Sequence, residues 1–402
     1  MTDYAIVGVG IVDSLGNDWH NNWLRYINGD VAISEITNFD LTKYPIIKVK
    51  QAYQLDDNVL DLSEILSDKE LKHLDRYSLA GLYTVKEALQ SCNITDIRKT
   101  AVFFSSLGAG SESILDGTVN LLNGKRSTPR LALSGQRDGL TGLISRVFGF
   151  QGANLCITSA CASGIMSLDY AIRLLSDDTY DQIVVGACDV MVAARDIYMF
   201  QCIGALDLRE SPVSNPFDSN RNGFIMGEGA VSFVVKKLAK AKEDGDNILS
   251  IIKGIGFANE AFHETAMSGD GIGARISIDM ALKKSGLDKS KIDLINAHAT
   301  STPNGDDIEY SILSEYFPDT PVQAIKSNIG HTMAACGLLE ISYLIKSMQQ
   351  SKIGPIANLN NPIGNRVLLP TSAVTGDYKF AIKNSFGFGG KSAAIILERG
   401  SS

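Results

Sequence analysis

The sequence has no apolar run that approaches the roughly 18 to 20 residues needed to cross a membrane. Its start, MTDYAIVGVG, has no basic segment ahead of the apolar residues, so it predicts a first strand and not a secretory signal peptide. Basic residues are in deficit, with 37 Lys and Arg against 45 Asp and Glu. These absences predict a soluble protein without a membrane partner and argue against non-specific binding of nucleic acid.

Cysteine is also scarce, at six residues in 402, and no two cysteines form a CxxC pair. This excludes a disulfide framework, a thioredoxin-like motif and the common zinc sites, so reduced thiols in the cytoplasm are expected. The GxxxxGK[ST] loop is missing, and Gly8, Gly10 and Gly16 lack the spacing of a dinucleotide-binding turn. Neither a nucleotide cofactor nor a metal is therefore expected.

Strand-like and helix-like patterns alternate along the rest of the chain. Strands are expected at residues 4–12, 100–105, 152–158, 181–187, 248–255 and 292–297, and helices at 78–92, 163–176, 273–285 and 305–316. Such alternation indicates βαβ units, an α/β fold and a mostly parallel sheet. A charged segment, 236–247, divides the chain near residue 245, while the polar residues 20–72 give no clear assignment.

The candidate nucleophile is Cys161, in the segment CITSACASGIM. A buried strand is expected to run through small residues directly into a helix, which makes a strand–turn–helix elbow. The dipole and free N–H groups at a helix N-terminus lower the pKa of a thiol and can stabilise an oxyanion. The alternative interpretation is a small buried hydrophobic residue, which is preferred for the other five cysteines.

Two of the five histidines lie just after expected strands. His298 follows the strand 292–297 in INAHATSTP, and His331 stands in AIKSNIGHTM at an expected helix start. Sites in α/β proteins gather at the carboxyl ends of strands, where a histidine can give or take a proton. Each histidine alone is more often structural, but the pair beside the Cys161 elbow favours catalysis. The other three, in polar or ambiguous surroundings, are His20, His73 and His263.

Lys326 follows the apolar run VQAI, an unusual place because lysine is rarely buried without a partner. One interpretation is a lysine at the rim whose ammonium reaches water. The other is a cation that tunes His331 or pairs with a buried carboxylate. The carboxylates considered for that pair are Asp306, Glu309 and Glu340.

The segment NSFGFGG, residues 384–390, sets two phenylalanines between glycines. Flexible glycines around large rings suggest a mobile loop that opens and closes a pocket. A tight turn that packs Phe386 and Phe388 into the core is the alternative.

Six motifs in this order resemble those of the elongating β-ketoacyl-[acyl-carrier-protein] synthases of the thiolase superfamily. They are VGVGIVDSLGND at the start, SACASG around Cys161, PFDSNRNGFIMGEGA at 216–230, HATSTPNGDDIE at 298–309, KSNIGH at 326–331 and NSFGFGG at 384–390. The resemblance spans nearly the whole chain. It implies a thiolase-like fold in which two related βαβαβ halves, residues 1–245 and 246–402, form a five-layered αβαβα core. The first half would also carry the cap and dimer insertions.

The resemblance implies a role for each matching residue. Cys161 would be the acylated nucleophile, His298 and His331 the histidine pair of the condensing site, and Lys326 the supporting lysine. Thiolases and acyl-CoA-priming synthases have Asn in place of one histidine, so this set is that of an elongating synthase. The substrate-binding residues would be Thr300, Thr302, Phe386, Phe388 and Gly389, and the supporting acidic residues Asp306, Glu309 and Glu340.

Within that set, Thr300 and Thr302 would bind a phosphopantetheine arm. Phe388 would be the gate, and its backbone N–H would form an oxyanion hole with that of Cys161. Three positions depart from the family pattern: Ala299 replaces a glycine, Asn222 replaces an aspartate, and Lys391-Ser392 replaces Thr-Asn. None removes a catalytic group, and the last lies beside the gate, where it bears on acyl specificity.

The implied reaction is the decarboxylative Claisen condensation of an acyl-enzyme thioester with malonyl-[acyl-carrier-protein], which gives 3-oxoacyl-[acyl-carrier-protein] in fatty acid biosynthesis. The alternative is the catalytic ketosynthase of a dedicated polyketide or polyene pathway with a chain-length partner subunit, towards which KSNIGH and Lys391-Ser392 lean. A non-catalytic chain-length or scaffold subunit fits poorly, because such subunits usually lack the cysteine. No resident cofactor is implied, since 4'-phosphopantetheine arrives on the carrier protein.

The implied partners are an acyl carrier protein and a second subunit, in a homodimer or a heterodimer. The carrier protein is expected to be acidic and this chain is acidic too, so docking needs a local basic patch. The candidates are Lys69, Lys72, Arg76, Arg126 and Arg130. An ordinary solvated face is the alternative interpretation of these charges.

Overall fold

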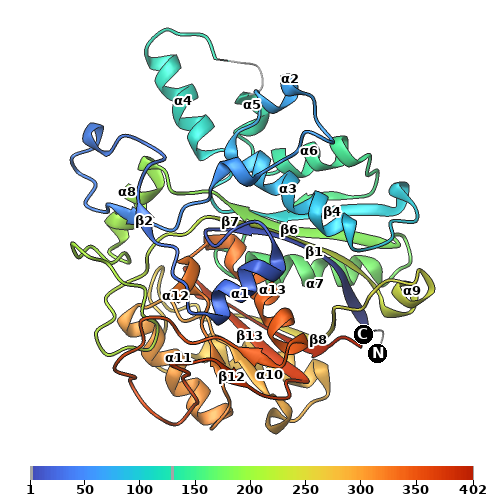
Figure 1. Cartoon of the computed structure of the whole chain (residues 1–402), viewed down its shortest axis with the longest axis vertical. Helices are drawn as coiled ribbons and strands as arrows, with labels where there is room; N and C mark the ends of the chain where they lie inside the picture. The colour runs from blue at the N-terminus through green and yellow to red at the C-terminus, as the bar shows by residue number, and fades with distance from the viewer. Residues whose placement is uncertain (1–2, 128–130, 402) are drawn as a thin grey trace.

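The computed structural model describes residues 3–127 and 131–401. The molecule has five layers, with helices outside, strands beneath them and helices at the centre (Figure 1). The two ends of the chain lie close together at one edge (Figure 1). Over the ranges just given, no helix combines the length and the apolar character that a membrane crossing requires.

The first half of the chain forms one group of five strands. They are β1 (Tyr4–Asp13), β4 (Thr100–Ser105), β5 (Asn154–Cys156), β6 (Gln182–Asp189) and β7 (Gly229–Lys237), in the order β5-β4-β6-β7-β1. β4 runs parallel to β5 and β6, whereas β7 pairs antiparallel with β6 and β1. The prediction of a buried strand ahead of Cys161 is wrong, because β5 is the edge strand and is largely exposed.

The second half repeats this arrangement. Its strands are β8 (Ser250–Asn259), β9 (Leu294–Asn296), β10 (Val322–Gln323), β13 (Phe380–Gly387) and β14 (Lys391–Arg399), in the order β10-β9-β13-β14-β8. β9 is parallel to β10 and β13, and β14 is antiparallel to β13 and β8. Two related halves are thereby confirmed. A mostly parallel sheet is wrong, because the last strand of each half runs opposite to both of its neighbours.

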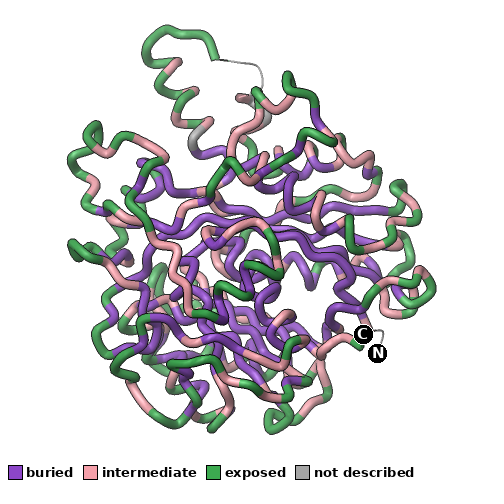
Figure 2. Tube along the Cα trace, in the orientation of Figure 1, coloured by how far each residue is buried: buried purple, intermediate pink, exposed green. Residues whose placement is uncertain are grey.

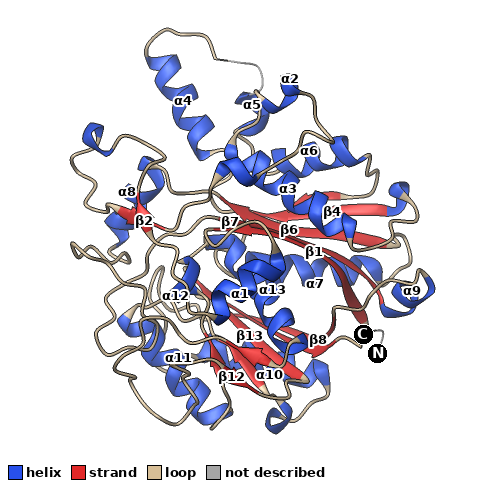
Figure 3. Ribbon diagram, viewed as in Figure 1, coloured by secondary structure: helices blue, strands red, loops and turns tan. Residues whose placement is uncertain are grey.

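The central layer holds the helices α7 (Ser163–Leu175) and α13 (Cys336–Gln349), which lie between the two groups of strands (Figure 3). Nearly every residue of α13 is buried, as expected for a helix covered on all sides. Side chains alternate across each strand, so Phe103 of β4 packs into this central core and Phe104 into the outer one. The two helices contact each other.

Helices α3 (Arg76–Gln90) and α10 (Ile272–Ser285) cover the outer faces at β1 and β8. A Cβ atom on Gly10 would lie 2.1 Å from the Thr84 carbonyl oxygen, and one on Gly256 would lie 2.0 Å from that of Ser277. Both helices therefore approach their strands more closely than a side chain would permit. Each half thus uses a strand glycine to let its outer helix pack closely.

The remaining elements surround this core. The helices are α1 (Trp19–Ile27), α2 (Asp68–Leu71), α4 (Ser111–Leu122), α5 (Leu131–Ser134), α6 (Gly139–Phe148), α8 (Ala194–Ile203), α9 (Leu238–Glu243), α11 (Pro303–Tyr316) and α12 (Lys326–Ile329). Short strands pair as β2 (Ser34–Glu35) with β3 (Gln51–Ala52) and β11 (Lys352–Ile353) with β12 (Val374–Thr375). Buried residues fill the strands and the centre, while α4 projects with an exposed surface (Figure 2).

Candidate active site

Cys161 stands between β5 and α7, in the strand–turn–helix arrangement that the sequence predicts. Ala160 before it has φ +49, a left-handed conformation that costs a residue with a side chain roughly 1–2 kcal/mol. The Ser163 Oγ accepts the Ser159 N–H at 2.6 Å and donates to the Ala160 carbonyl at 2.5 Å. This hydroxyl therefore holds the turn that presents the thiol.

Left-handed backbone recurs beside both candidate histidines. Ala299, next to His298, has φ +40, and Met333, two residues after His331, has φ +49. Such conformations persist only where surrounding contacts impose them, and they concentrate at functional sites. The loops that carry the thiol and the two imidazoles are all of this kind.

The Cys161 thiol lies beside a second thiol. Cys336, the first residue of α13, is buried, and its Sγ is 3.7 Å from the Cys161 carbonyl oxygen. A hydrogen bond to Cys336 and burial raise the pKa of the Cys161 thiol well above its usual value, against the opposing charge of Lys326. The sequence predicts a lowered pKa from the end of the helix, whereas Cys336 and burial act in the opposite direction.

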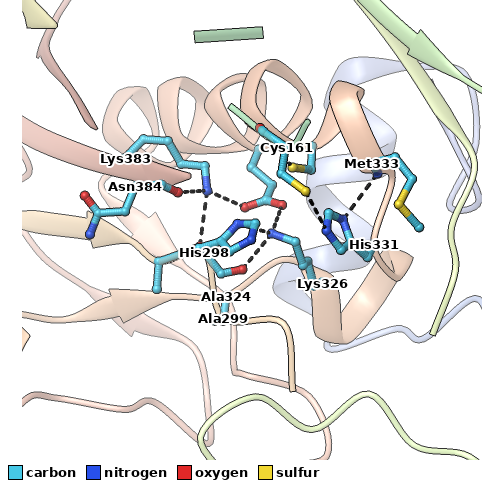
Figure 4. Close-up of polar contacts among 12 residues, drawn as sticks. Cys161, His298, Ala299, Ala324, Lys326, His331, Met333, Lys383 and Asn384 are labelled. Atoms are coloured by element: carbon cyan, nitrogen blue, oxygen red, sulfur yellow. Dashed lines mark hydrogen bonds and ion pairs between the residues drawn. The ribbon is translucent and has the colours of Figure 1, made fainter. Parts of the chain in front are cut away.

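His331 faces the nucleophile, with Nε2 3.2 Å from the Cys161 Sγ (Figure 4). Its Nδ1 accepts the Met333 N–H at 3.2 Å. An accepting nitrogen carries no proton, so neutral His331 is protonated on Nε2. Phe224 packs edge-on against the ring, with centroids 5.1 Å apart, and helps to fix its orientation.

Lys326 sets the tautomer of His298. Its Nζ is 3.3 Å from His298 Nδ1, 2.6 Å from the His298 carbonyl oxygen and 2.6 Å from Glu340 Oε1. These three acceptors match the three protons of an ammonium group, so Nδ1 accepts and Nε2 carries the ring proton. Burial, then Lys326 and then His331, lower the pKa of His298 well below its usual range. The ring is therefore neutral near pH 7.

Cys161, His298 and His331 meet at one point (Figure 4). One Sγ or ring nitrogen of each lies within 4.8 Å of those of the other two, and the imidazole centroids are 5.5 Å apart at 83°. A thiol thus shares a small volume with two N–H donors. This suits a nucleophile whose substrate develops negative charge on oxygen.

A cysteine with two histidines is also a donor set for zinc. To ligate a metal, each Nε2 would have to lose its proton and each Nδ1 would have to take one up. The Lys326 ammonium and the Met333 N–H oppose this change, because both already donate to an Nδ1. The geometry therefore favours proton donors over metal ligands.

Of the carboxylates considered for Lys326, Glu340 is the partner, at 2.6 Å. All three ammonium protons are directed at acceptors on His298 and Glu340, so the histidine that Lys326 contacts is His298. An influence of its charge on His331 stays a prediction. The rim interpretation is wrong, since Lys326 is buried.

The other two carboxylates support the site without touching Lys326. Glu309 accepts the backbone N–H groups of His298 at 2.8 Å and Ala299 at 2.7 Å, which fixes the histidine loop to α11. Asp306 accepts the Phe217 N–H at 2.9 Å, and burial raises the pKa of its carboxyl group to about 7.

A cavity of about 380 Å³ opens onto the three catalytic candidates. Thr300 and Thr302 form part of its wall, with their Oγ1 atoms 2.9 Å apart. Apolar residues form much of the remainder, among them Leu107, Phe200, Ile203, Phe224 and Met333. The cavity therefore suits a ligand with an apolar chain and a polar arm.

The glycine-rich segment is a hairpin turn between β13 and β14. Gly389 and Gly390 have φ +81 and +71, so this turn requires glycine at both positions. Phe386 is buried in the core and Phe388 is half-buried, and both line the cavity. Gly389 does not line the cavity; it is exposed, and its N–H donates to the Glu264 carbonyl at 2.7 Å.

The segment 216–230 mainly braces the site. Arg221 donates to the carbonyl groups of Thr302 and Pro303 at the start of α11. Asn222, which departs from the family pattern, donates to Asp207 at 3.2 Å. Through Arg221, the motif therefore holds the loop after His298 and the start of α11 against the first half of the chain.

One charged group near the site was not predicted. Lys383 of β13 is fully buried, and its Nζ is 2.7 Å from Glu340 Oε2 (Figure 4). The available signal was a lysine inside the otherwise apolar run FAIKNSF. Without the fold, no sequence pattern paired it with a glutamate 43 positions away.

Two family models match the chain. The one described as Beta-ketoacyl synthase, N-terminal domain matches residues 1–241, and Beta-ketoacyl synthase, C-terminal domain matches residues 249–360. A 3-oxoacyl-[acyl-carrier-protein] synthase II, chloroplastic, of Arabidopsis thaliana is 30% identical over 411 residues, which cover 98% of this chain and 75% of that protein. The 3-oxoacyl-[acyl-carrier-protein] synthase 2 of Rhizobium meliloti is 30% identical over 421 residues and 99% of each chain.

Solved structures show the same fold. A β-ketoacyl synthase from Burkholderia phymatum STM815 aligns with a TM-score of 0.91 at 24% identity, over 99% of this chain and 100% of that one. The ishigamide ketosynthase/chain length factor aligns with a TM-score of 0.89 at 25% identity, over 99% of both chains. The thiolase-like fold is confirmed. The chain belongs to the β-ketoacyl-[acyl-carrier-protein] synthase family of the thiolase superfamily and is an acyltransferase.

Proposed function

We propose that the chain condenses an acyl group held on Cys161 with malonyl-[acyl-carrier-protein], with loss of carbon dioxide, to give 3-oxoacyl-[acyl-carrier-protein] in fatty acid biosynthesis. The observation that carries this is the meeting of the Cys161 thiol with the imidazole rings of His298 and His331 at a largely apolar cavity. The names of the A. thaliana and R. meliloti relatives point to the same product.

In the first half-reaction, the Cys161 Sγ attacks the carbonyl carbon of an acyl thioester on the carrier protein. The His331 Nε2–H, 3.2 Å away, stabilises the thiolate. The new S–C bond forms, the carrier's S–C bond breaks, and the departing thiolate takes the proton that Cys161 lost. The proposed oxyanion donors are the N–H groups of Cys161 and Phe388. The gate turn supports this pairing, since a Cβ on Gly387 would lie 3.0 Å from the Cys161 nitrogen.

In the second half-reaction, malonyl-carrier protein loses carbon dioxide and leaves an enolate. Its oxygen accepts the Nε2–H groups of His298 and His331. The carbanion attacks the acyl thioester, a C–C bond forms, and the C–S bond to Cys161 breaks. This step needs neutral imidazoles that still carry Nε2 protons, which the low pKa of His298 supports.

The carrier's phosphopantetheine arm is proposed to bind Thr300 and Thr302, whose hydroxyl groups line the cavity. Phe386 and Phe388 flank the same space and are proposed to contact the substrate. Gly389 is proposed to act through the shape of the turn alone. The arm is part of the substrate, so the reaction needs no resident cofactor or metal.

The proposed partner is an acyl carrier protein, and its docking patch is proposed at Lys69, Lys72 and Arg126, which are exposed. Arg76 contributes less, because it is paired with Glu228 and Asp57, and Arg130 lies outside the described residues. Reversing the charge of the exposed lysines and of Arg126 is expected to weaken use of carrier-bound acyl groups while leaving reaction with acyl-CoA intact. Equal losses with both donors would contradict this patch.

We propose a homodimer in the cytoplasm. Leu155 on the edge strand β5 is 47% exposed, and an apolar residue on an unpaired edge favours contact with a second chain. All six cysteines are free, which supports a reducing compartment.

A second candidate is the ketosynthase of a polyketide or polyene pathway, paired with a chain-length subunit. The alignment with the ishigamide ketosynthase/chain length factor favours it. The deciding experiment incubates the purified chain with a panel of acyl-carrier proteins and malonyl-carrier protein and analyses the products by mass. A single extension by two carbons supports the first candidate, and repeated extension without reduction supports the second. No condensation product from any donor would contradict both.

A further inference from the structure

Lys383 is a buried charge that the proposed reaction does not use. Its Nζ lies 2.6 Å from the Asn384 carbonyl oxygen, 3.2 Å from that of Ala297 and 2.7 Å from Glu340 Oε2 (Figure 4). Three oxygen acceptors match the three protons of an ammonium group. Burial lowers the pKa of Lys383, and the charge of Glu340 opposes that lowering. A buried charge is costly unless it is paired, and here Glu340 is the pair.

Glu340 connects Lys383 to the candidate catalytic residues. Its Oε2 accepts from Lys383 at 2.7 Å and its Oε1 from Lys326 at 2.6 Å, so two ammonium groups share one buried carboxylate. Lys326 in turn lies 3.3 Å from His298 Nδ1. The direction in which Glu340 holds Lys326, and hence the orientation of His298, depends on the contact with Lys383.

Lys383 also contributes to the charge balance around His298. The titratable groups that face this imidazole directly or through one partner are Lys326 of α12, Lys383 of β13, Glu309 of α11, Glu340 and Cys336 of α13, His331 and Cys161. After burial, Lys326 and His331, the charge of Lys383 adds to the lowering of the pKa of His298. Removal of that charge makes His298 easier to protonate.

We propose that Lys383 is a positioning residue for the condensing half-reaction. By fixing Glu340 it holds Lys326 against His298 Nδ1 and so keeps the His298 Nε2–H directed at the enolate oxygen. This inference rests on the proposed function.

The kinetic test uses Lys383→Met, which removes the charge and keeps much of the side-chain length. Loss of a direct oxyanion donor lowers a rate by about 10²–10³, so an indirect displacement is expected to lower kcat for condensation by about 10- to 100-fold. KM for malonyl-carrier protein should change little. The acid limb of the kcat–pH profile should move to higher pH, because His298 loses a neighbouring positive charge.

The matched control is Lys236→Met. Lys236 is also fully buried, between Asp244 at 2.7 Å and Asp246 at 2.6 Å, and it belongs to β7, which carries none of the candidate site residues. It should lower the melting temperature without moving the acid limb. A general weakening of the fold lowers the melting temperature without shifting the acid limb of the kcat–pH profile. A shift in Lys383→Met alone therefore distinguishes a positioning role from a loss of stability.

A second measurement does not depend on activity. NMR titration of the histidine side chains, with the His298 signal assigned by loss in His298→Asn, reports the pKa of this ring directly. It should rise in Lys383→Met and stay unchanged in Lys236→Met. If Lys383→Met does not fold, Lys383→Gln takes its place, since its amide can still donate to the two carbonyl groups. If the wild-type chain gives no condensation but the pKa of His298 still rises in Lys383→Met, the proposed function is refuted and only the effect of Lys383 on His298 stands.

Coupling through Glu340 is tested by the double variant Lys383→Met/Glu340→Gln. If Lys383 acts through Glu340, the losses in kcat are not additive. Additive losses would overturn the proposal. So would an unchanged His298 titration and an unchanged acid limb in both Lys383 variants.

Discussion

In the first half of the molecule, the connection from the edge strand β5 to the central helix α7 carries Cys161. In the second half, the corresponding connection from β10 to α13 carries Lys326 and His331. Both connections leave the edge strand of a half and lead to a helix of the central layer. This topological position therefore supplies the nucleophile from the first half and one proton donor, His331, from the second, while the other donor, His298, follows β9.

The two halves differ in the charged side chains that they place at the site. The elbow at Cys161 is made of small neutral residues, and its thiol has a raised pKa. The second half buries two lysines on one glutamate behind His298. The fold provides an equivalent position in each half. The side chains at that position make the first half the source of the nucleophile and the second half a source of proton donors.

The largest expected effect comes from replacing the two neighbouring cysteines, Cys161 and Cys336, one at a time. Cys161→Ala should abolish condensation, a loss on the order of 10⁴-fold or more, since no other group takes over a nucleophile. Cys336→Ala should keep activity and lower the pKa of the Cys161 thiol, because Cys336 is the main cause of its rise. Product formation and the pH dependence of Cys161 alkylation measure both. Elongation by Cys161→Ala would show that the nucleophile is assigned wrongly.

Removing either imidazole should separate the two half-reactions. His298→Ala and His331→Ala each remove one Nε2–H donor and should lower condensation by about 10²–10³. Acylation of Cys161 should be retained better, since it does not form the enolate. Intact-protein mass and product yield measure the two steps on one sample. Equal loss of both would count against the donor role.

Buried carboxylates in the two halves should differ in importance. Glu340→Gln leaves two ammonium groups without a counter-charge and should lower the free energy of unfolding by about 3–5 kcal/mol. Asp189→Asn in the first half removes an acceptor of N–H groups, among them those of Leu107 and Ala334, and should cost about 1–3 kcal/mol. Denaturant titration compares them. A greater loss for Asp189→Asn would reverse the expected ranking.

The close approaches of helix to strand should be equivalent in the two halves. Gly10→Ala and Gly256→Ala each place a Cβ 2.0–2.1 Å from a helix carbonyl oxygen, so each should cost about 1–3 kcal/mol of stability through overpacking. Melting curves of the two variants should be displaced alike. A large effect in one half alone would show that the repeat does not extend to packing.

The smallest effect is expected at the strained alanines. Ala160→Gly and Ala299→Gly relieve left-handed backbone worth roughly 1–2 kcal/mol and lose about 0.5–1 kcal/mol to the freedom of glycine in the unfolded chain. A net gain in stability of about 0–1.5 kcal/mol should follow in both. A clear destabilisation would show that these positions carry no strain.

The sequence predicted local elements well where a pattern is strong. β4 has the predicted limits, and α7 ends within one residue of the prediction. Strand direction and exposure were predicted poorly, because an apolar run such as that of β5 does not show which strands pair beside it. The repeat was invisible to simple matching, yet the Gly-x-Gly at Gly8 and Gly10 returns at Gly254 and Gly256.

In the candidate site, too, local motifs were predicted well and contacts between distant segments were not. The motifs predicted that Cys161, His298 and His331 belong together, and the structure brings them together. The raised pKa of the Cys161 thiol depends on its contact with Cys336. Lys383 belongs to the site through its contact with Glu340. Both contacts join segments that are far apart in the sequence. Such contacts arise only when the two halves fold against each other, so no local pattern contains them.

The most direct test of the shared site is a single-turnover experiment on the wild-type chain, followed by intact mass and peptide mapping. With an acyl-carrier thioester, the account predicts one acyl group on the Cys161 peptide. Addition of malonyl-carrier protein should discharge it and yield one equivalent of 3-oxoacyl product. An acyl group on another residue, or an adduct on Cys161 that malonyl-carrier protein does not discharge, would contradict the account.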